Sequence, residues 1–227
     1  MLVGRGSELE TLTAHLERDQ PVAITGEGGI GKTALLHAAL AGSRGVRLGG
    51  ALASLSWMEY APIARALGVR RLTGDAAAVA DRVRAALGED GVLALEDLHW
   101  ADDGTLGVVE LLAPSVPLVV TVRTGDPASD RVQSTLEALD FATIALGPLG
   151  ADDATALVRS LTPDVSAVSL ARVVRRCGGV PLLLTQLSGP EGEEAESLRL
   201  ALASRLRGVS AEARAAFELL AVVGRPV

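Results

Sequence analysis

The segment that most constrains the fold of this chain is residues 21–33, which read Pro-Val-Ala-Ile-Thr-Gly-Glu-Gly-Gly-Ile-Gly-Lys-Thr. A short apolar run typical of a β-strand, residues 22–25, leads into a glycine-rich loop, and a helix-forming run, residues 33–40, follows. This order is the context that a phosphate-binding P-loop requires. Glycines let the loop curl so that its backbone N–H groups point inward, next to the positive end of the helix.

The loop supplies the candidate ligands for the phosphates of a nucleotide: Gly26, Glu27, Gly28, Gly29, Ile30, Gly31, Lys32 and Thr33. Lys32 is expected to reach the β- and γ-phosphates, and the Thr33 hydroxyl is expected to bind Mg²⁺. Lys32 is also the only lysine among the 21 Lys and Arg residues of the chain. Because a planar guanidinium does not replace a compact ammonium between phosphates, a lysine kept at this position favours a working nucleotide site.

Two further apolar runs end in charged residues. Residues 92–95 are followed at once by Glu96 and Asp97, which is the Walker B arrangement. Glu96 is expected to help hold Mg²⁺, and Asp97 to orient or deprotonate the attacking water. Residues 117–122 end in Arg123, which is a candidate sensor of the γ-phosphate if it is not an ordinary surface arginine. For His99, a supporting or helix-start position is favoured over direct chemistry.

The remaining pattern predicts an α/β fold. Strands are expected at residues 22–25, 45–52, 92–95, 117–122 and 141–146. Helices are expected after Ser7 and at residues 33–40, 57–67 in part, 75–87, 105–112, 130–139, 151–161, 165–177 and 181–187, with two more at 197–206 and 211–223. Most strands are separated by helices, so the sequence predicts a five-stranded parallel sheet flanked by helices, followed by an all-helical region.

Smaller predictions concern single residues. Ser7 and Glu10 fit a capping box at the start of the first helix. Trp57 and Tyr60 are expected to pack in the interior rather than to bind a ligand. Cys177 is expected to be a buried, apolar packing residue and not a nucleophile. Ser188 begins an acidic linker that extends to residue 196.

Composition excludes several classes of protein. The chain of 227 residues is 48% hydrophobic but only 2% aromatic, so its core must be aliphatic. Its net charge of −7 argues against direct nucleic-acid binding by this segment. A single cysteine rules out an internal disulfide and fits a reducing compartment. The N-terminus does not resemble a signal peptide, and no apolar run approaches the length of a membrane span, so a cytoplasmic location without membrane contact is expected.

Taken together, these features resemble the ATPase module of STAND proteins, the signal-transduction ATPases related to AAA+, and in particular the nucleotide-binding region of large LuxR-type transcription regulators. The resemblance rests on Leu2-Val3-Gly4-Arg5 with Glu8, the P-loop, residues 96–102, residues 119–123, and the turns at 147–149 and 178–181. It implies a P-loop domain at residues 1–147, a helical lid at 148–189, and a linker with the start of a winged-helix-like domain at 190–227. It also implies that Val3, Gly4, Arg5 and Pro181 border the adenine.

The function that this resemblance implies is a regulatory switch that binds ATP or ADP with Mg²⁺ and hydrolyses ATP slowly. Its partners would be C-terminal output domains, namely repeats and a DNA-binding helix-turn-helix, so we expect the chain to be an excised part or an unusually short protein. Glu96 stands where the family usually has Asp, which puts efficient hydrolysis in doubt. A metabolic P-loop phosphotransferase and a ring-forming AAA+ ATPase that self-associates with nucleotide are the alternatives. Guanine specificity is not expected, because the chain has no asparagine for the usual guanine-reading motif.

Overall fold

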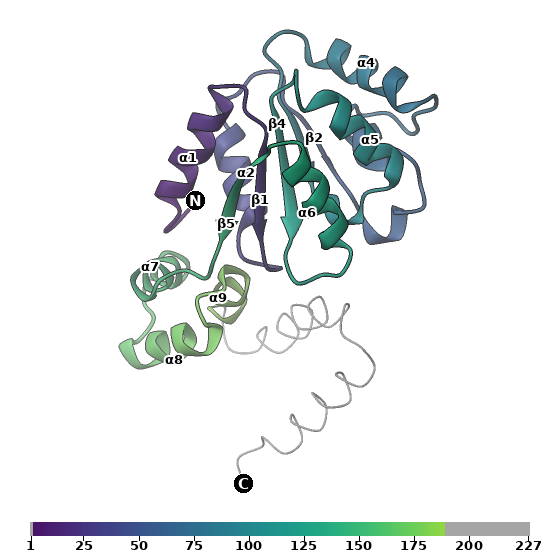
Figure 1. The fold of residues 1–227 in the computed structure, drawn as a ribbon. Helices are drawn as coiled ribbons and strands as arrows, with labels where there is room; N and C mark the ends of the chain where they lie inside the picture. Colours follow the sequence, from purple (N-terminus) through teal and green to yellow (C-terminus); the bar gives the residue numbers. More distant parts are fainter. Residues whose placement is uncertain (1, 189–227) are drawn as a thin grey trace, which may run out of the picture. The chain divides into compact units, whose positions relative to one another are not determined.

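The computed structural model describes residues 2–188, which fall into two compact units that meet between Pro148 and Leu149. The first unit contains a single sheet with the strand order β2-β3-β4-β1-β5, in which every pair is parallel (Figure 1). The strands are β1 (Val22–Gly26), β2 (Arg47–Gly50), β3 (Leu93–Glu96), β4 (Leu118–Arg123) and β5 (Ala142–Leu146). The predicted five-stranded parallel sheet is confirmed, and the strand order adds that β4 lies between β1 and β3.

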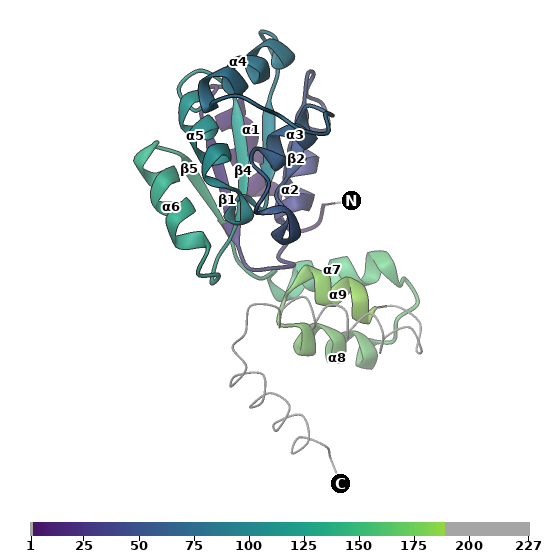
Figure 2. The same ribbon diagram turned by 90° about the vertical axis from the view of Figure 1, so that its right-hand side faces the viewer.

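Helices cover both faces of this sheet. Those of the first unit are α1 (Gly6–Leu16), α2 (Lys32–Leu40), α3 (Ala61–Ala66), α4 (Ala76–Leu87), α5 (Asp103–Leu112) and α6 (Ser129–Ala138), with short 3-10 turns η1 (Ala53–Leu55) and η2 (Leu98–Trp100). Helices α1 and α2 cover one face and α3 to α6 cover the other, where α4 and α5 lie side by side (Figures 1 and 2). The buried side chains of the two sets of helices belong to two separate clusters.

Strand residues alternate between these two layers. Leu93 and Leu95 of β3 join the cluster under α3 to α6, while Ala94 between them joins the cluster under α1 and α2. A strand buried on both faces has no polar alternation, which is why the runs of β1, β3 and β4 are continuously apolar in the sequence. The core is aliphatic, as the composition requires. Among residues 2–188, the cluster under α3 to α6 contains two large aromatic side chains, Tyr60 and Phe141.

The second unit begins at Leu149, and its described part, residues 149–188, contains three helices: α7 (Ala151–Leu161), α8 (Ala167–Cys177) and α9 (Pro181–Leu187). They enclose a small apolar cluster that includes Val158, Leu170 and Leu184. Cys177 belongs to this cluster, and burial raises the pKa of its thiol, so the expectation of a packing residue is confirmed. The helices predicted at 197–206 and 211–223, and the linker from residue 189 to 196, lie outside the described residues.

Two local predictions are wrong. Ser7 does not cap α1, because the helix already begins at Gly6; the Ser7 hydroxyl instead donates to the Glu8 carboxylate. Trp57 is 76% exposed, with its indole N–H donated to the Ser54 carbonyl, so it does not pack in the interior. Tyr60 does pack in the interior: it is buried, and its hydroxyl donates to the Gly74 carbonyl.

None of the helices within residues 2–188 combines the length and the apolar character that crossing a membrane requires.

Candidate nucleotide-binding site

The P-loop connects β1 to α2 at the carboxyl end of the sheet. Its backbone needs glycine at three positions, because Gly26, Gly29 and Gly31 have φ values of +148°, +78° and +106°. At Gly26 space is also limited, since an added Cβ would lie 2.7 Å from the Leu146 carbonyl oxygen of the neighbouring strand. The predicted glycine loop between a strand and a helix is therefore present, with the conformation that glycine allows.

Lys32, the first residue of α2, is folded back over this loop. Its Nζ donates to the carbonyl oxygens of Gly26 and Glu27 at 2.8 and 2.9 Å, and only 7% of the residue is exposed. Burial lowers the pKa of Lys32 to about 8, and the negative charge of Asp97 partly opposes this effect. A partly desolvated ammonium held at the mouth of a glycine loop is suited to an anionic ligand that would replace the lost water. Thr33, the next residue, is exposed at the same end of the helix.

The two carboxylates follow β3 as predicted. Glu96 ends the strand, and its Oε1 is buried without a hydrogen-bond partner among the described residues. Asp97 adopts a left-handed backbone with φ +53°, which turns the chain away from the sheet. Burial raises the pKa of Asp97, Lys32 opposes this shift, and the Glu96 charge adds to it.

These oxygens fit Mg²⁺ bound together with a nucleotide. Among residues 2–188, no group of three or more His, Cys, Asp or Glu side chains could hold a metal ion alone. Mg²⁺ does not need such a cage, because it is commonly held by one or two carboxylates, substrate phosphates and water. The buried, unpaired oxygen of Glu96 and the exposed hydroxyl of Thr33 are the ligands that this arrangement would use.

Arg123 ends β4, which lies between the Walker B strand β3 and the P-loop strand β1. The Arg123 guanidinium packs directly on the P-loop, since a Cβ added at Gly28 would collide with it. The next residue, Thr124, joins the end of β4 to the end of β1, because its N–H donates to the Gly26 carbonyl at 3.1 Å. The strand order therefore places Lys32, Asp97 and Arg123 close enough for each to influence the charge of another.

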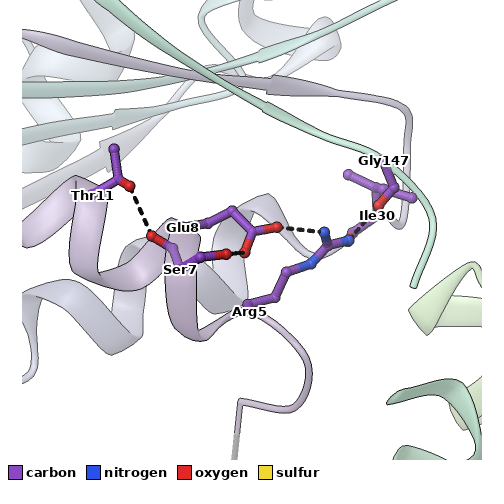
Figure 3. Close-up of polar contacts among 6 residues, drawn as sticks. All are labelled: Arg5, Ser7, Glu8, Thr11, Ile30 and Gly147. Atoms are coloured by element: carbon purple, nitrogen blue, oxygen red, sulfur yellow. Dashed lines mark hydrogen bonds and ion pairs between the residues drawn. The ribbon is translucent and has the colours of Figure 1, made fainter. Parts of the chain in front are cut away.

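Arg5, in the N-terminal segment, contacts the P-loop at Ile30 (Figure 3). It is only 6% exposed, forms an ion pair with Glu8 at 2.8 Å, and donates to the carbonyl oxygens of Ile30 and Gly147. It thereby joins the N-terminal segment to the P-loop and to the end of β5. Val3 is half-buried and Gly4 is exposed beside it, while Pro181 begins α9 in the second unit. That these four residues border an adenine stays a prediction.

Two residues support these groups through buried hydrogen bonds, and of the two only His99 was assigned a part from the sequence. The Thr121 hydroxyl accepts the Asp97 N–H at 2.9 Å, and a lone polar residue inside the apolar run of β4 is a signal that could have indicated it. His99 is buried and accepts the Arg123 N–H, which agrees with the supporting position favoured for it. Asp102 caps α5 by accepting the Thr105 N–H and also binds the Tyr60 N–H.

A glycine loop with a buried lysine, two carboxylates on a nearby strand and a parallel sheet flanked by helices define a P-loop NTPase fold. Comparison with known proteins narrows this class. Residues 1–90 match the family described as the AAA ATPase domain. No curated protein matches the chain.

Solved structures show the same fold. The chain is similar to a Walker-type ATPase of Pyrococcus abyssi, with 14% identity and a TM-score of 0.65 over 98% of this chain and 77% of the other. A STAND protein with a tetratricopeptide repeat sensor from Pyrococcus horikoshii gives 17% identity and a TM-score of 0.54 over 88% of this chain and 32% of the other. The RuvB Holliday junction branch migration motor of Thermotoga maritima gives 13% identity and a TM-score of 0.56 over 88% of this chain and 64% of the other.

At these identities the likeness shows the fold, and this chain spans only about a third of the STAND protein. The family match and the fold together support an AAA+-type P-loop ATPase module. The likeness to LuxR-type regulators stays a prediction.

Proposed function

We propose that this chain is the ATPase module of a signalling switch, which binds ATP or ADP with Mg²⁺ and hydrolyses ATP slowly. The observation that carries the proposal is the arrangement around the P-loop. Lys32 crosses the loop, Asp97 is close enough to oppose the pKa shift of Lys32, and the Arg123 guanidinium packs on Gly28. A γ-phosphate bound at the loop would meet a cation, a carboxylate and an arginine that all come from one chain.

In this proposal each side chain has a separate task. The loop residues Gly26 to Thr33 bind the phosphates, Thr33 and Glu96 hold Mg²⁺, Asp97 orients the attacking water, and Arg123 contacts the γ-phosphate. Val3, Gly4, Arg5 and Pro181 would border the adenine, as the resemblance to STAND ATPases implies. The bound Mg²⁺ would neutralise charge on the phosphates during transfer.

Two features favour a switch over a fast enzyme. Glu96 is one methylene longer than the usual aspartate, so with Mg²⁺ bound it would shift the metal-bound water and slow hydrolysis. Arg123 and Lys32 distinguish ATP from ADP through the third phosphate, so the difference in contacts between the two nucleotides is concentrated at two side chains. The STAND protein among the similar structures supports a signalling function, and we propose a cytoplasmic transcription regulator with C-terminal output domains as the setting.

The second candidate is a ring-forming AAA+ ATPase, which the similarity to the RuvB motor favours. The two functions differ in where the arginine that meets the γ-phosphate comes from. A ring requires one from the next subunit, whereas in the switch Arg123 of the same chain suffices. Self-association with nucleotide is compatible with both, so mass alone does not distinguish them.

The test is a mixing experiment that measures ATP hydrolysis and molar mass by light scattering. Wild type is mixed in increasing amounts with Lys32→Met, which cannot use its own site. A switch predicts that activity per wild-type chain stays constant. If activity per wild-type chain instead changes with the fraction of Lys32→Met, and hexamers form with a non-hydrolysable ATP analogue, the protein is a ring-forming ATPase and the proposed switch is wrong.

A further inference from the structure

The end of the β3–β4 ladder has an unusual construction. Regular pairing between the two strands stops at Leu95 and Val120, because the chain turns away from the sheet at Asp97. Hydrogen bonds along a strand alternate between its two neighbours. The Thr124 N–H points to β1 and donates to Gly26, so the Arg123 N–H points to the side of β3, where the ladder has already ended.

Two side chains replace the missing ladder bonds. Thr121, on β4, accepts the N–H of Asp97 at 2.9 Å, and His99, on the chain that follows β3, accepts the N–H of Arg123 through Nδ1 at 3.4 Å. A side chain of β4 thus binds a backbone N–H after β3, and a side chain after β3 binds a backbone N–H of β4. Thr121 is 1% exposed and His99 is 3% exposed, so water does not compete for either bond.

The chemistry of His99 indicates that this residue is present to accept the hydrogen bond from Arg123. Nδ1 can accept the Arg123 N–H only without a proton, so the proton lies on Nε2, which is buried and has no partner among the described residues. An unpaired buried N–H is unfavourable, and leucine at this place would avoid it. The ring of Trp100, with its centroid 4.4 Å away, limits how the imidazole can turn.

We propose that Thr121 and His99 are positioning residues that hold Asp97 and Arg123 in register with each other at the phosphate site. The inference rests on the proposed function, because it assigns an effect to residues that act through Asp97 and Arg123. Thr121 fixes the carboxylate that orients water. His99 fixes the strand end that carries the γ-phosphate sensor and, through Thr124, contacts the P-loop.

The test compares variants that keep or lose each acceptor. His99→Asn places an amide oxygen near the position of Nδ1, whereas His99→Gln places it near Nε2. Thr121→Ser keeps the hydroxyl, and Thr121→Val removes it with little change in shape. Thr105→Val is the control, since it removes a buried hydroxyl contact to Asp102 in α5, outside the site. Calorimetry gives the affinities for ATP and ADP, a phosphate-release assay gives kcat and KM, and melting curves show that each variant is folded.

We expect substitutions at Thr121 to change kcat and substitutions at His99 to change the preference for ATP over ADP. Thr121→Val lowers kcat at least fivefold with KM within twofold, and Thr121→Ser restores it. His99→Gln lowers the preference for ATP over ADP at least fivefold, His99→Asn retains it, and Thr105→Val changes neither quantity by more than twofold. In the Arg123→Ala background, His99→Gln should cause no further loss of preference, because it acts through that residue.

The inference is overturned if His99→Gln and His99→Asn behave alike, or if the effect of His99→Gln is unchanged when Arg123 is already alanine. It also fails if Thr121→Val affects kcat no more than Thr105→Val does. Failure of the proposed function has a different signature, because wild type would then not bind adenine nucleotide, or Arg123→Ala alone would leave the ATP-to-ADP preference unchanged.

Discussion

The ammonium of Lys32 makes the affinity for ATP depend on pH in a range where nucleotides themselves no longer titrate. Burial lowers the pKa of Lys32 to about 8 in the free protein. Phosphate groups at the P-loop would favour the charged form and raise that pKa again. Binding therefore favours the protonated lysine, and where the free protein has lost that proton, Lys32 must take one up from solution when ATP binds.

The magnitude follows from this pKa. With a value of about 8, roughly nine-tenths of the Lys32 side chains are charged at pH 7 and about one-tenth at pH 9. ATP affinity should therefore fall about tenfold from pH 7 to pH 9, with close to one proton taken up per ATP at pH 9. Replacing Lys32 by Met removes a charge-assisted contact of about 1.5–3 kcal/mol, so affinity at pH 7 should fall roughly 10- to 150-fold.

The assay is isothermal calorimetry of ATP binding with excess Mg²⁺ at pH 7, 8 and 9, each in two buffers with different ionisation enthalpies. The buffer dependence of the heat counts the protons taken up. Lys32→Met is the matched control, because it keeps the length of the side chain and loses the titrating group. The reasoning is refuted if wild-type affinity is the same at pH 7 and pH 9, or if Lys32→Met takes up the same number of protons.

Three other predictions concern separate parts of the molecule. Asp97→Asn should keep ATP affinity within a few-fold and lower turnover at least tenfold, because a water-orienting carboxylate acts mainly in the transition state; if Glu96→Gln loses turnover and Asp97→Asn does not, the two acids are assigned the wrong way round. Arg5→Met should lower the free energy of unfolding by about 2–3 kcal/mol in urea, since it leaves buried acceptors unpaired, whereas Arg84→Met, at an exposed ion pair, should lower it by less than about 1 kcal/mol. Burial lowers the pKa of His99 from 6.5 to about 4, so His99 takes up a proton in the unfolded chain before it does in the folded protein as pH falls. Between pH 6.5 and 4, the free energy of unfolding of wild type should therefore fall by on the order of 2–3 kcal/mol more than that of His99→Asn. Equal losses in the two proteins would contradict this.

Local sequence patterns were enough to predict most elements of the fold. The P-loop and the apolar runs of β3 and β4 are encoded within a few residues, so the structure places them close to the predicted positions. The capping box at Ser7 failed because the same residue types also occur inside a helix, where the Ser7 hydroxyl binds its neighbour Glu8 instead.

The strand order and the contacts between distant segments were not predictable in the same way. No local pattern states that β4 enters between β1 and β3, and this order is what brings Arg123 onto Gly28. Arg5 likewise contacts Ile30 and Gly147, which are far from it in sequence. The candidate residues, Arg123 and Arg5 included, are therefore visible in the sequence, whereas their contacts with Gly28, Ile30 and Gly147 become visible only in the fold.

The central claim is that the P-loop holds an adenine nucleotide as a regulatory ligand. The most direct measurement is mass spectrometry of the nucleotide released when the purified protein is denatured, for wild type and Lys32→Met side by side. If the P-loop holds such a ligand, wild type releases ADP in nearly equimolar amount and Lys32→Met releases almost none. A guanine nucleotide in wild type, or ADP released in equal amount by both proteins, would contradict it.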